Sequence, residues 1–416
     1  MSSQFGPQGL ACAFKGSFPL PVITSVFVVL LVGGNLAGVE PGLSRIGARP
    51  EAGRSDAVVV SNAALAHTAQ LLPGAAVASS AGEHCKAALQ RLGALLQQEQ
   101  AQTGDVVRLN VYLRHSQDRA AVDRVLADWS AGNPPAVSYV ATPLPGGALV
   151  ALDAVFISRA SPRSTQLPIR RGGTTPGRAD VCVGPPGDWT FVSGQAAAGD
   201  LRTATRDTLA GLLKTIDGIG MSREHVVAIK CFLQPMKDHE SVNDEIARAF
   251  APALAPPVSH VEWIAGSRPI EIELVAWAPS GETSLHAKQP RIEFHTPAWL
   301  KPSPVFSRVA TIRGNQLIYL SSLHADKPGD GAEQARSLFS QLQSVTAASG
   351  SSMQDLAKAT YYVSSDAASR ALNDLRPSQY HPERPPAASK AMVSDVGAVD
   401  RHLVLDMIAA PANQPR

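Results

Sequence analysis

The sequence repeats one short pattern three times, and this repeat constrains the fold more than any other feature. The clearest copy is the segment PPVSHV at 256–261, which is followed by the apolar segment 269–277. Two weaker copies lie on either side of it: 134–140 with 149–155, and 385–390 with 403–409. In each copy a Pro-rich turn and a strand precede a second strand that carries one acidic residue. Because internal repeats set the whole architecture, we interpret the chain as three related modules.

Other landmarks keep the same register. An apolar run ends at Thr68, at Ser193 and at Ser321, and these positions are 125 and 128 residues apart. The acidic residues recur with a similar spacing: Asp153, Glu273 and Asp406. Between these landmarks each copy shows a helical periodicity of apolar residues, followed by the alternation of a strand. The pattern predicts the order strand, helix, strand, helix, strand, strand in each module, which is an α+β two-layer sandwich.

The landmarks also suggest where the modules begin and end. The chain has 416 residues, of which 44% are hydrophobic and 17% charged, so several ordinary domains fit within it. The stretches between the repeats are rich in Pro and polar residues, which is typical of linkers. We expect an N-terminal extension at 1–50, modules at 51–158, 180–279 and 304–411, and linkers at 159–179 and 280–303.

The charge of the chain gives no reason to expect nucleic acid as a partner. The formal net charge is +2, whereas a nucleic-acid-binding domain usually has a clustered basic face. The densest basic stretch, 159–178, is mixed with Ser, Pro, Gly and Thr, so we interpret it as a solvated linker.

The first 50 residues contain an apolar run at 18–32, and no charged residue lies between Lys15 and Glu40. This pattern resembles a secretory signal or a short membrane anchor. Against it, the basic region is thin, Pro19 and Pro21 begin the run, and a spanning helix needs about 20 apolar residues. The pattern favours an exported or anchored protein over a cytoplasmic one. A disordered or mis-started extension is the alternative.

Cysteine and histidine spacing predicts neither a metal site nor a cofactor. Cys85, Cys182 and Cys231 form no CxxC pair, and the eleven His residues form no HExxH motif. The sequence also lacks a Gly-rich phosphate loop and a GxSxG elbow. We therefore expect no metal and no cofactor.

Taken together, the motifs support a family assignment. The second module has Ser193-Gly194-Gln195, Asn243 and Glu271-Ile272-Glu273; the first has Ser55, Thr68-Ala69-Gln70, Asp123 and Asp153; the third has Ser307-Arg308, Ser321, Asn373 and Asp406. In this order they resemble the YjgF/RidA family, also called the L-PSP endoribonuclease or translation-inhibitor family. The resemblance covers about 320 of the 416 residues, as three tandem diverged copies.

The resemblance implies a fold, an assembly and a reaction. RidA-like (chorismate mutase-like) modules form homotrimers with a small-molecule cleft at each subunit interface, and the enzymatic members hydrolyse enamines and imines of 2-amino acids. The family's Arg holds the substrate carboxylate, while an acid in the last strand and a Ser-Gly strand end position water. Three modules on one chain would form an intramolecular pseudo-trimer, so we expect a monomer.

The chain departs from the family at the arginine. That position is Val137 in the first module, Val258 in the second and Ala388 in the third, and none of these can bind a carboxylate. Two residues further on, the sequence has Tyr139, His260 and Lys390. We expect these side chains to point toward the clefts, with Lys390 or His260 as a substitute cation. The alternative is that they are partly exposed strand residues.

The second module is closest to the family, so we assign the candidate site there. Glu273 and Ser193 are the candidate catalytic residues. The candidate ligand-binding residues are Gly194, Asn243, His260, Tyr139, Lys390, Thr68, Asp153, Ser321 and Asp406. For the three acids, a structural hydrogen-bond role is equally open, because a buried carboxylate always needs partners. For Ser193 and Thr68, a site role and a simple position at the end of a strand are equally open.

Two classes of function remain open at this stage. One is a diverged RidA-like hydrolase or lyase of imine, enamine or related carbonyl-derived metabolites that lacks the carboxylate-binding Arg. The other is a catalytically silent binding or scaffold protein that retains the trimeric shape. Chorismatases have a similar body, but their motifs are absent here. We expect a small-molecule ligand at inter-module clefts, no nucleic acid, and membrane contact only through the N-terminal segment.

Overall fold

The computed structural model of the protein describes residues 42–74, 80–160, 169–264, 267–279 and 291–412. These residues belong to one compact unit, Glu40–Arg416. The apolar run at 18–32, for which we expected a signal or an anchor, lies outside the described residues. Within the described part of the chain, no helix has the length and apolar character needed to span a bilayer.

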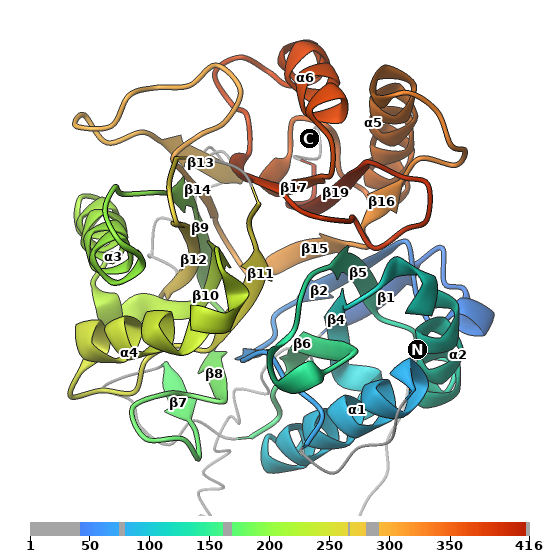
Figure 1. Ribbon diagram of the computed structural model, residues 1–416, viewed down its shortest axis with the longest axis horizontal. Coiled ribbons are helices and arrows are strands. Elements are labelled where there is room, and N and C mark those ends of the chain that lie inside the picture. The colour runs from blue at the N-terminus through green and yellow to red at the C-terminus, as the bar shows by residue number, and fades with distance from the viewer. Residues whose placement is uncertain (1–41, 75–79, 161–168, 265–266, 280–290, 413–416) are drawn as a thin grey trace, which may run out of the picture. The chain divides into compact units, whose positions relative to one another are not determined.

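Each of the three modules has the predicted order of strands and helices (Figure 1). The first consists of β3 (Leu65–Thr68), α1 (Ala81–Gln98), β4 (Val106–Leu113), α2 (Arg119–Ser130), β5 (Ala136–Ala141) and β6 (Val150–Ile157). The second consists of β9 (Asp188–Gln195), α3 (Leu201–Asp217), β10 (Val226–Leu233), α4 (His239–Phe250), β11 (Val258–Glu262) and β12 (Ile270–Ala278). The third consists of β15 (Gln316–Leu320), β16 (Leu323–His324), α5 (Gly331–Ala348), β17 (Leu356–Val363), α6 (Asp366–Leu375), β18 (Ala387–Met392) and β19 (Leu403–Ala409).

Three further strand pairs extend the sheets, and each pair precedes the module that follows it in the chain. They are β1 (Gly42–Ile46) with β2 (Ala57–Ser61), β7 (Arg170–Gly172) with β8 (Val181–Gly184), and β13 (Ile292–His295) with β14 (Val309–Ile312). Strands β1, β7 and β13 were not predicted, because they fall in the segments interpreted as an extension and as linkers. These short strands carry little alternation of their own and gain their hydrogen bonds from a neighbouring sheet.

The sheet of each module is completed by a strand pair that precedes a different module in the chain. The sheet orders are β5-β4-β6-β3-β8-β7, β11-β10-β12-β9-β14-β13 and β18-β17-β19-β15-β2-β1, with β16 also pairing with β19. Strand β8 therefore pairs with β3 of the first module, although β9 of the second module follows it directly in the chain. In the same way the N-terminal strand β2 pairs with β15 and completes the third sheet. These pairings connect the first module to the second, the second to the third, and the third back to the first.

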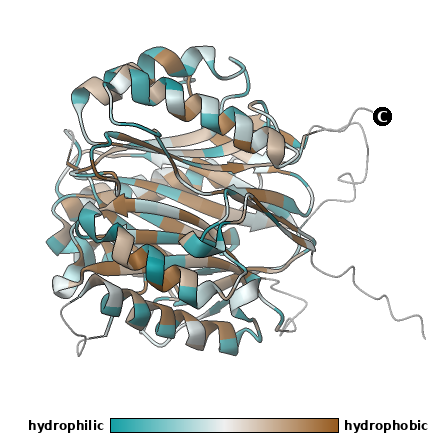
Figure 2. Cartoon of the chain, turned by 90° about the vertical axis from the view of Figure 1, so that its right-hand side faces the viewer, coloured by the Kyte–Doolittle hydropathy of each residue, from teal (hydrophilic) through white to brown (hydrophobic). Residues whose placement is uncertain are grey.

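Helices cover the outer face of each sheet, and the inner faces meet around a common centre (Figures 1 and 2). Each helical layer buries its own hydrophobic cluster against its sheet, as α1 and α2 do with Leu92, Val122 and Leu109. A separate cluster lies between the three sheets and includes Trp189, Phe191 and Tyr319. The chain is thus a pseudo-trimer of three α+β modules, as the sequence predicts, with one core per module and a shared central core.

The basic stretch 159–178 has more contacts than a solvated linker would. Arg159 pairs with Asp105 at 2.7 Å, and Arg170 pairs with the fully buried Glu99. Among the described residues of this stretch, the arginines therefore anchor the connection between the first and second modules. The sequence pattern alone gave no sign of this, because the acidic partners lie about 55–70 residues earlier in the chain.

Candidate functional site

Six charged side chains from all three modules gather at the centre of the molecule. They line a cavity of about 80 Å³, where the inner faces of the sheets meet. The cations are Arg108, Lys230 and Lys358, and the anions are Asp153, Glu273 and Asp406. The three acids that the sequence analysis singled out therefore lie together on the pseudo-threefold axis.

Two of these acids form ion pairs across module boundaries. Arg108 on β4 donates a hydrogen bond to Asp406 on β19, and Lys358 on β17 lies 2.8 Å from Glu273 on β12. Burial opposes ionisation of Asp406, but Arg108 and the two lysines outweigh it and hold the pKa of this carboxyl below its usual value. The pairs join the first module to the third and the third to the second.

Asp153 is stabilised differently. It accepts hydrogen bonds from Asn110 Nδ2, at 2.6 Å, and from the Tyr112 hydroxyl, both within the first module. The strand register explains the difference: Ala228 occupies in the second module the position of Arg108 and Lys358, so no cation reaches Asp153 from there. Lys230, two residues further on, lies 3.4 Å from the Tyr362 hydroxyl instead.

This geometry favours a structural role for Asp153 and Asp406. It also separates the two candidate catalytic residues, Glu273 and Ser193, from each other. Glu273 lines the axial cavity, whereas Ser193 is buried, does not line that cavity and has no hydrogen-bond partner for its Oγ among the described residues. Thr68 Oγ1 accepts from the Ala154 backbone N–H at 2.9 Å, so it helps to hold β6.

The modules meet where the strand end of one module contacts the Pro-turn strand of the next. At the first–second interface, Gln70 Nε2 donates to the carbonyl oxygen of His260 at 3.2 Å. At the second–third interface, the Gly194 N–H donates to Ser389 Oγ at 3.0 Å. At the third–first interface, Ser321 Oγ accepts from the Val137 N–H at 2.7 Å. A hydrogen bond thus links the strand end of one module to the Pro-turn strand of the next at each interface, but the donor and acceptor groups differ.

At the second–third interface the acid beside the Ser-Gly strand end is Glu271. A Cβ built on Gly194 would lie 2.1 Å from Glu271 Oε1, so only glycine allows the carboxyl to pack against this backbone. Burial, reinforced by the charge of Glu273, raises the pKa of Glu271 to about 8. The Ser389 hydroxyl is hydrogen-bonded to the same carboxyl. We expected Glu273 in this place, but the structure has Glu271.

Lys390 lies on the opposite side of this interface, on β18. Its Nζ donates to Ser369 Oγ at 3.0 Å and to Asn373 Oδ1 at 3.1 Å. Burial lowers the pKa of Lys390, as does the nearby Arg376, while Glu271 opposes the shift. Of the three residues expected to point toward a cleft, Lys390 is therefore the one whose charge acts on Glu271.

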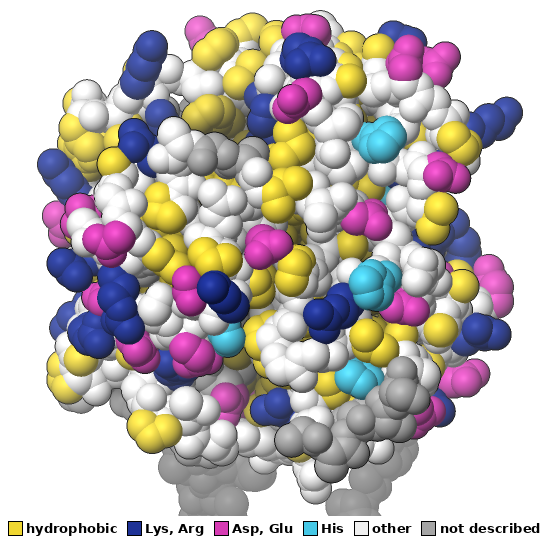
Figure 3. Space-filling model, in the orientation of Figure 1, with side chains coloured by type: hydrophobic (Ala, Val, Ile, Leu, Met, Phe, Trp, Pro, Cys, Tyr) yellow, Lys and Arg dark blue, Asp and Glu magenta, His cyan; other side chains and the backbone are white. Residues whose placement is uncertain are grey.

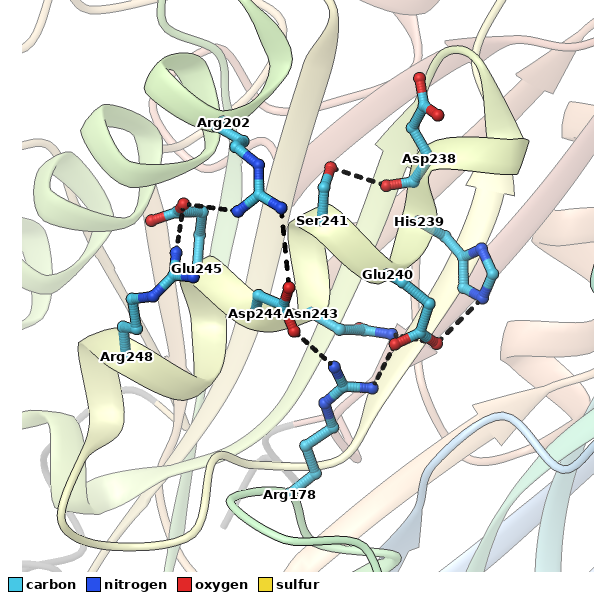
Figure 4. Close-up of polar contacts among 10 residues, drawn as sticks. All are labelled: Arg178, Arg202, Asp238, His239, Glu240, Ser241, Asn243, Asp244, Glu245 and Arg248. Carbon is cyan, nitrogen blue, oxygen red and sulfur yellow. Dashed lines mark hydrogen bonds and ion pairs between the residues drawn. The ribbon is translucent and has the colours of Figure 1, made fainter.

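Asn243 belongs to a different network, around α4 (Figure 4), and His260 contacts this network through His239. Asn243 Nδ2 lies 3.4 Å from Glu240 Oε1, and Arg178 pairs with Glu240 at 2.7 Å. His260 packs edge-on against His239, with ring centroids 5.6 Å apart. Burial lowers the pKa of His260 to about 3, helped by His239 and Arg178. His260 is therefore neutral at physiological pH, and the expectation that it serves as a cation is wrong.

Tyr139 and Ser321 lie at the third–first interface. Tyr139 is buried, and its hydroxyl donates to Asp123 Oδ1 at 2.5 Å, while Ser321 Oγ donates to the carbonyl of Ser55 at 2.5 Å. The position of Glu271 in the second module corresponds to Ala151 in the first and Val404 in the third. Among these three equivalent positions, an acid therefore occurs only at the second–third interface.

Other classes of site receive no support from the described residues. No cluster of His, Cys, Asp or Glu there has the geometry of a metal site. On the face in Figure 3, acidic and basic side chains are interspersed, and no large area carries one sign of charge. The mixed surface agrees with the small net charge of the chain.

The fold and interfaces define a class of protein, a single-chain pseudo-trimer of α+β modules with polar inter-module contacts. The family model described as Endoribonuclease L-PSP matches residues 52–157 and 181–278, which fall in the first and second modules. The chain belongs to this family, which is the YjgF/RidA family of the sequence analysis. No curated protein matches the chain.

Solved structures similar to parts of the chain include other members of this family. A member of the YjgF family from Neisseria meningitidis is 21% identical, with 29% of this chain and 98% of that chain covered and a TM-score of 0.22. The Rid-family protein YyfB of unknown function from Yersinia pestis is 22% identical, with 29% of this chain and 99% of that chain covered and a TM-score of 0.26. Yeast Mmf1 is 18% identical, with 29% of this chain and 99% of that chain covered and a TM-score of 0.22.

Proposed function

We propose that the protein is a small-molecule-binding member of its family whose reactive site lies at the second–third interface, where it hydrolyses the C=N bond of small imines, including imines that form when enamines tautomerise. The observation that carries this proposal is Glu271, whose carboxyl packs against Gly194 and has a pKa of about 8. A carboxyl with a pKa near the working pH can both give and take a proton.

The chemistry of such a step follows from the groups at the interface. Water adds to the C=N carbon, and one of its protons passes to nitrogen through Glu271 to give a carbinolamine. The remaining hydroxyl proton then passes to nitrogen through the same carboxyl as the C–N bond breaks, which leaves a carbonyl and ammonia. The Gly194 backbone and Ser389 hold the carboxyl in place. Lys390 supplies the positive charge on the other side of the interface, as a point charge and not as a bidentate guanidinium.

The missing arginine limits the substrates. Val137, Val258 and Ala388 occupy its position, so a 2-imino acid loses its charge-assisted carboxylate contact. A lost contact of this kind costs about 2–5 kcal/mol, which is tens to thousands fold in rate. We therefore propose weak activity toward 2-imino acids and better activity toward imines without a carboxylate.

The test uses 2-iminobutyrate generated in situ, with loss of the imine as the readout. Because β18 faces Glu271, the arginine must be restored at Ala388; the matched control is Val258→Arg, at the first–second interface where Ala151 takes the acid's place. Ala388→Arg should raise the rate, and Glu271→Gln in that background should remove the gain. A gain with Val258→Arg, or no loss with Glu271→Gln, would contradict the proposal. Thermal unfolding of each variant checks that the fold survives.

A silent binding or scaffold protein is the second candidate. It is favoured by Ala151 and Val404, which leave two of three interfaces without the acid, and by the buried ion pairs that hold the modules together. Under this alternative Glu271→Gln has no effect on any imine, whether or not the arginine is restored.

A further inference from the structure

The ion pair between Lys358 and Glu273 belongs to the same interface as the proposed reactive site. Glu273 lies on β12 of the second module, and Lys358 lies on β17 of the third. Glu271 precedes Glu273 on β12 by two residues, so both side chains point to the same face of the sheet, about 7 Å apart along the strand. The charges on the pseudo-threefold axis are therefore close neighbours of the reactive carboxyl.

Polar side chains on β17 and β18 extend from the ion pair toward the reactive site. Lys358 Nζ lies 2.8 Å from Glu273 Oε1 and donates to Thr360 Oγ1 at 2.7 Å. Thr360 is the cross-strand partner of Ser389, whose hydroxyl is hydrogen-bonded to the Glu271 carboxyl. Thr360 and Ser389 are both buried. Little water can therefore screen the axial charges from the reactive carboxyl.

The charges that act on Glu271 come from its own strand and from the third module. Burial raises the pKa of Glu271, and the negative charge of Glu273 adds to this effect. The positive charges of Lys358 and Lys390 oppose it. Around the two acids, β9 contributes the Gly194 backbone, and the further titratable side chains nearby are Lys230 on β10 and Tyr362 on β17.

The other two interfaces lack such a pair of neighbouring acids. Ala151 and Val404 occupy the position of Glu271 in the first and third modules. A negative charge beside a carboxyl disfavours its ionisation, and a nearby cation favours it. The balance between Glu273 and Lys358 therefore affects how readily Glu271 gives up its proton.

We propose that Lys358 and Glu273 are positioning residues of the reactive site, and that their ion pair sets the pH range in which Glu271 can exchange its proton. This inference rests on the proposed function, because it assigns a control to the same carboxyl. Neither residue needs to touch the substrate, since each acts on Glu271 through its charge.

The two members of the pair should have opposite effects. Without Lys358, the charge of Glu273 is uncompensated, so Glu271 should keep its proton to a higher pH. Without Glu273, the carboxyl loses a repelling neighbour and should release its proton at a lower pH. An ion pair with only a structural role would instead destabilise the fold when either partner is removed, and neither change would move the titration of Glu271.

The test is an NMR titration of the full chain with isotope-labelled glutamate Cδ, in which Glu271→Gln identifies the signal of Glu271. Lys358→Met should raise the titration midpoint by about one pH unit, and Glu273→Gln should lower it by a similar amount. Lys327→Met, which removes an exposed lysine of the third module, is the matched control and should leave the midpoint unchanged. Lys358→Arg keeps the charge and should keep the midpoint close to that of the wild type.

Opposite shifts in Lys358→Met and Glu273→Gln support the proposal, whereas no shift in either variant, or shifts in the same direction, would overturn it. If thermal unfolding shows that Lys358→Met does not fold, a midpoint that fails to fall in the isosteric Glu273→Gln overturns it alone. The titration needs no substrate. Opposite shifts without hydrolysis of any imine would therefore refute only the proposed function, and hydrolysis without the shifts would refute only this inference.

Discussion

Lys358 Nζ of the third module lies 2.8 Å from Glu273 Oε1 of the second module, and both side chains are nearly inaccessible to solvent, at 13% and 4% exposed. The same strand position in the first module is Arg108, which pairs with Asp406 of the third. The modules of this single chain are therefore joined at the axis by buried charges. A chain with three different modules can place a different residue at each equivalent position, which three identical subunits cannot do.

Removing one partner of a buried pair should destabilise the pseudo-trimer strongly. Arg108→Met leaves Asp406 buried without its partner, and such a change typically costs about 3–5 kcal/mol. We expect a clear drop in the midpoint of thermal unfolding. Arg336→Met, which removes an exposed charge, should have almost no effect. The double variant Arg108→Met/Asp406→Asn should recover part of the loss, and a double variant as unstable as Arg108→Met would contradict this interpretation.

The sequence predicted the modules because each inner strand carries its own pattern. The Pro-turn, the alternating strand and the acid recur with nearly constant spacing, so the order of elements and the pseudo-trimer followed from residues such as Asp153 and Glu273. The pairs β1–β2, β7–β8 and β13–β14 could not be assigned in this way. Their place in a neighbouring module's sheet depends on long-range pairing, which local sequence does not encode.

The site was only partly predictable for a related reason. Ser193-Gly194 and Lys390 do meet across an interface, but Glu271 and not Glu273 accompanies them. Both acids lie on one strand two residues apart, so the sequence alone did not show which one reaches the strand end.

The axial cavity should contain ordered water. Glu273 Oε2, His67 Nε2 and the Tyr319 hydroxyl line it, are buried and have no hydrogen-bond partner among the described residues. A polar cavity of about 80 Å³ has room for a few water molecules, each of which needs 2–4 polar partners. A crystal structure at high resolution should show density within hydrogen-bond distance of these three atoms. An empty cavity in such a map would contradict the prediction.

The cysteines on the described strands and helices should be unreactive in the folded protein. Cys85, Cys182 and Cys231 are buried and free. Burial raises the pKa of Cys85 to about 12 and that of Cys182 to about 12, so the reactive thiolate is scarce at neutral pH. Titration with a thiol reagent should detect at most Cys12 before denaturation and all four thiols in denaturant. Rapid labelling of Cys85 in the native state, located by mass spectrometry, would show that α1 opens.

Glu271 should make the protein less stable as the pH rises. Its pKa is about 8 in the folded protein, well above that of an exposed glutamate near 4.3, so the folded state holds a proton that the unfolded chain has lost. Stability from this group is complete below pH 4 and decreases as the pH rises toward 8, where the folded carboxyl ionises. Glu271→Gln, which is always neutral, should therefore have a higher unfolding midpoint than the wild type at pH 9 and a similar one at pH 4. Glu383→Gln, an exposed acid, is the control and should shift neither midpoint. If the wild type and Glu271→Gln keep the same difference in midpoint at both pH values, Glu271 does not titrate as proposed.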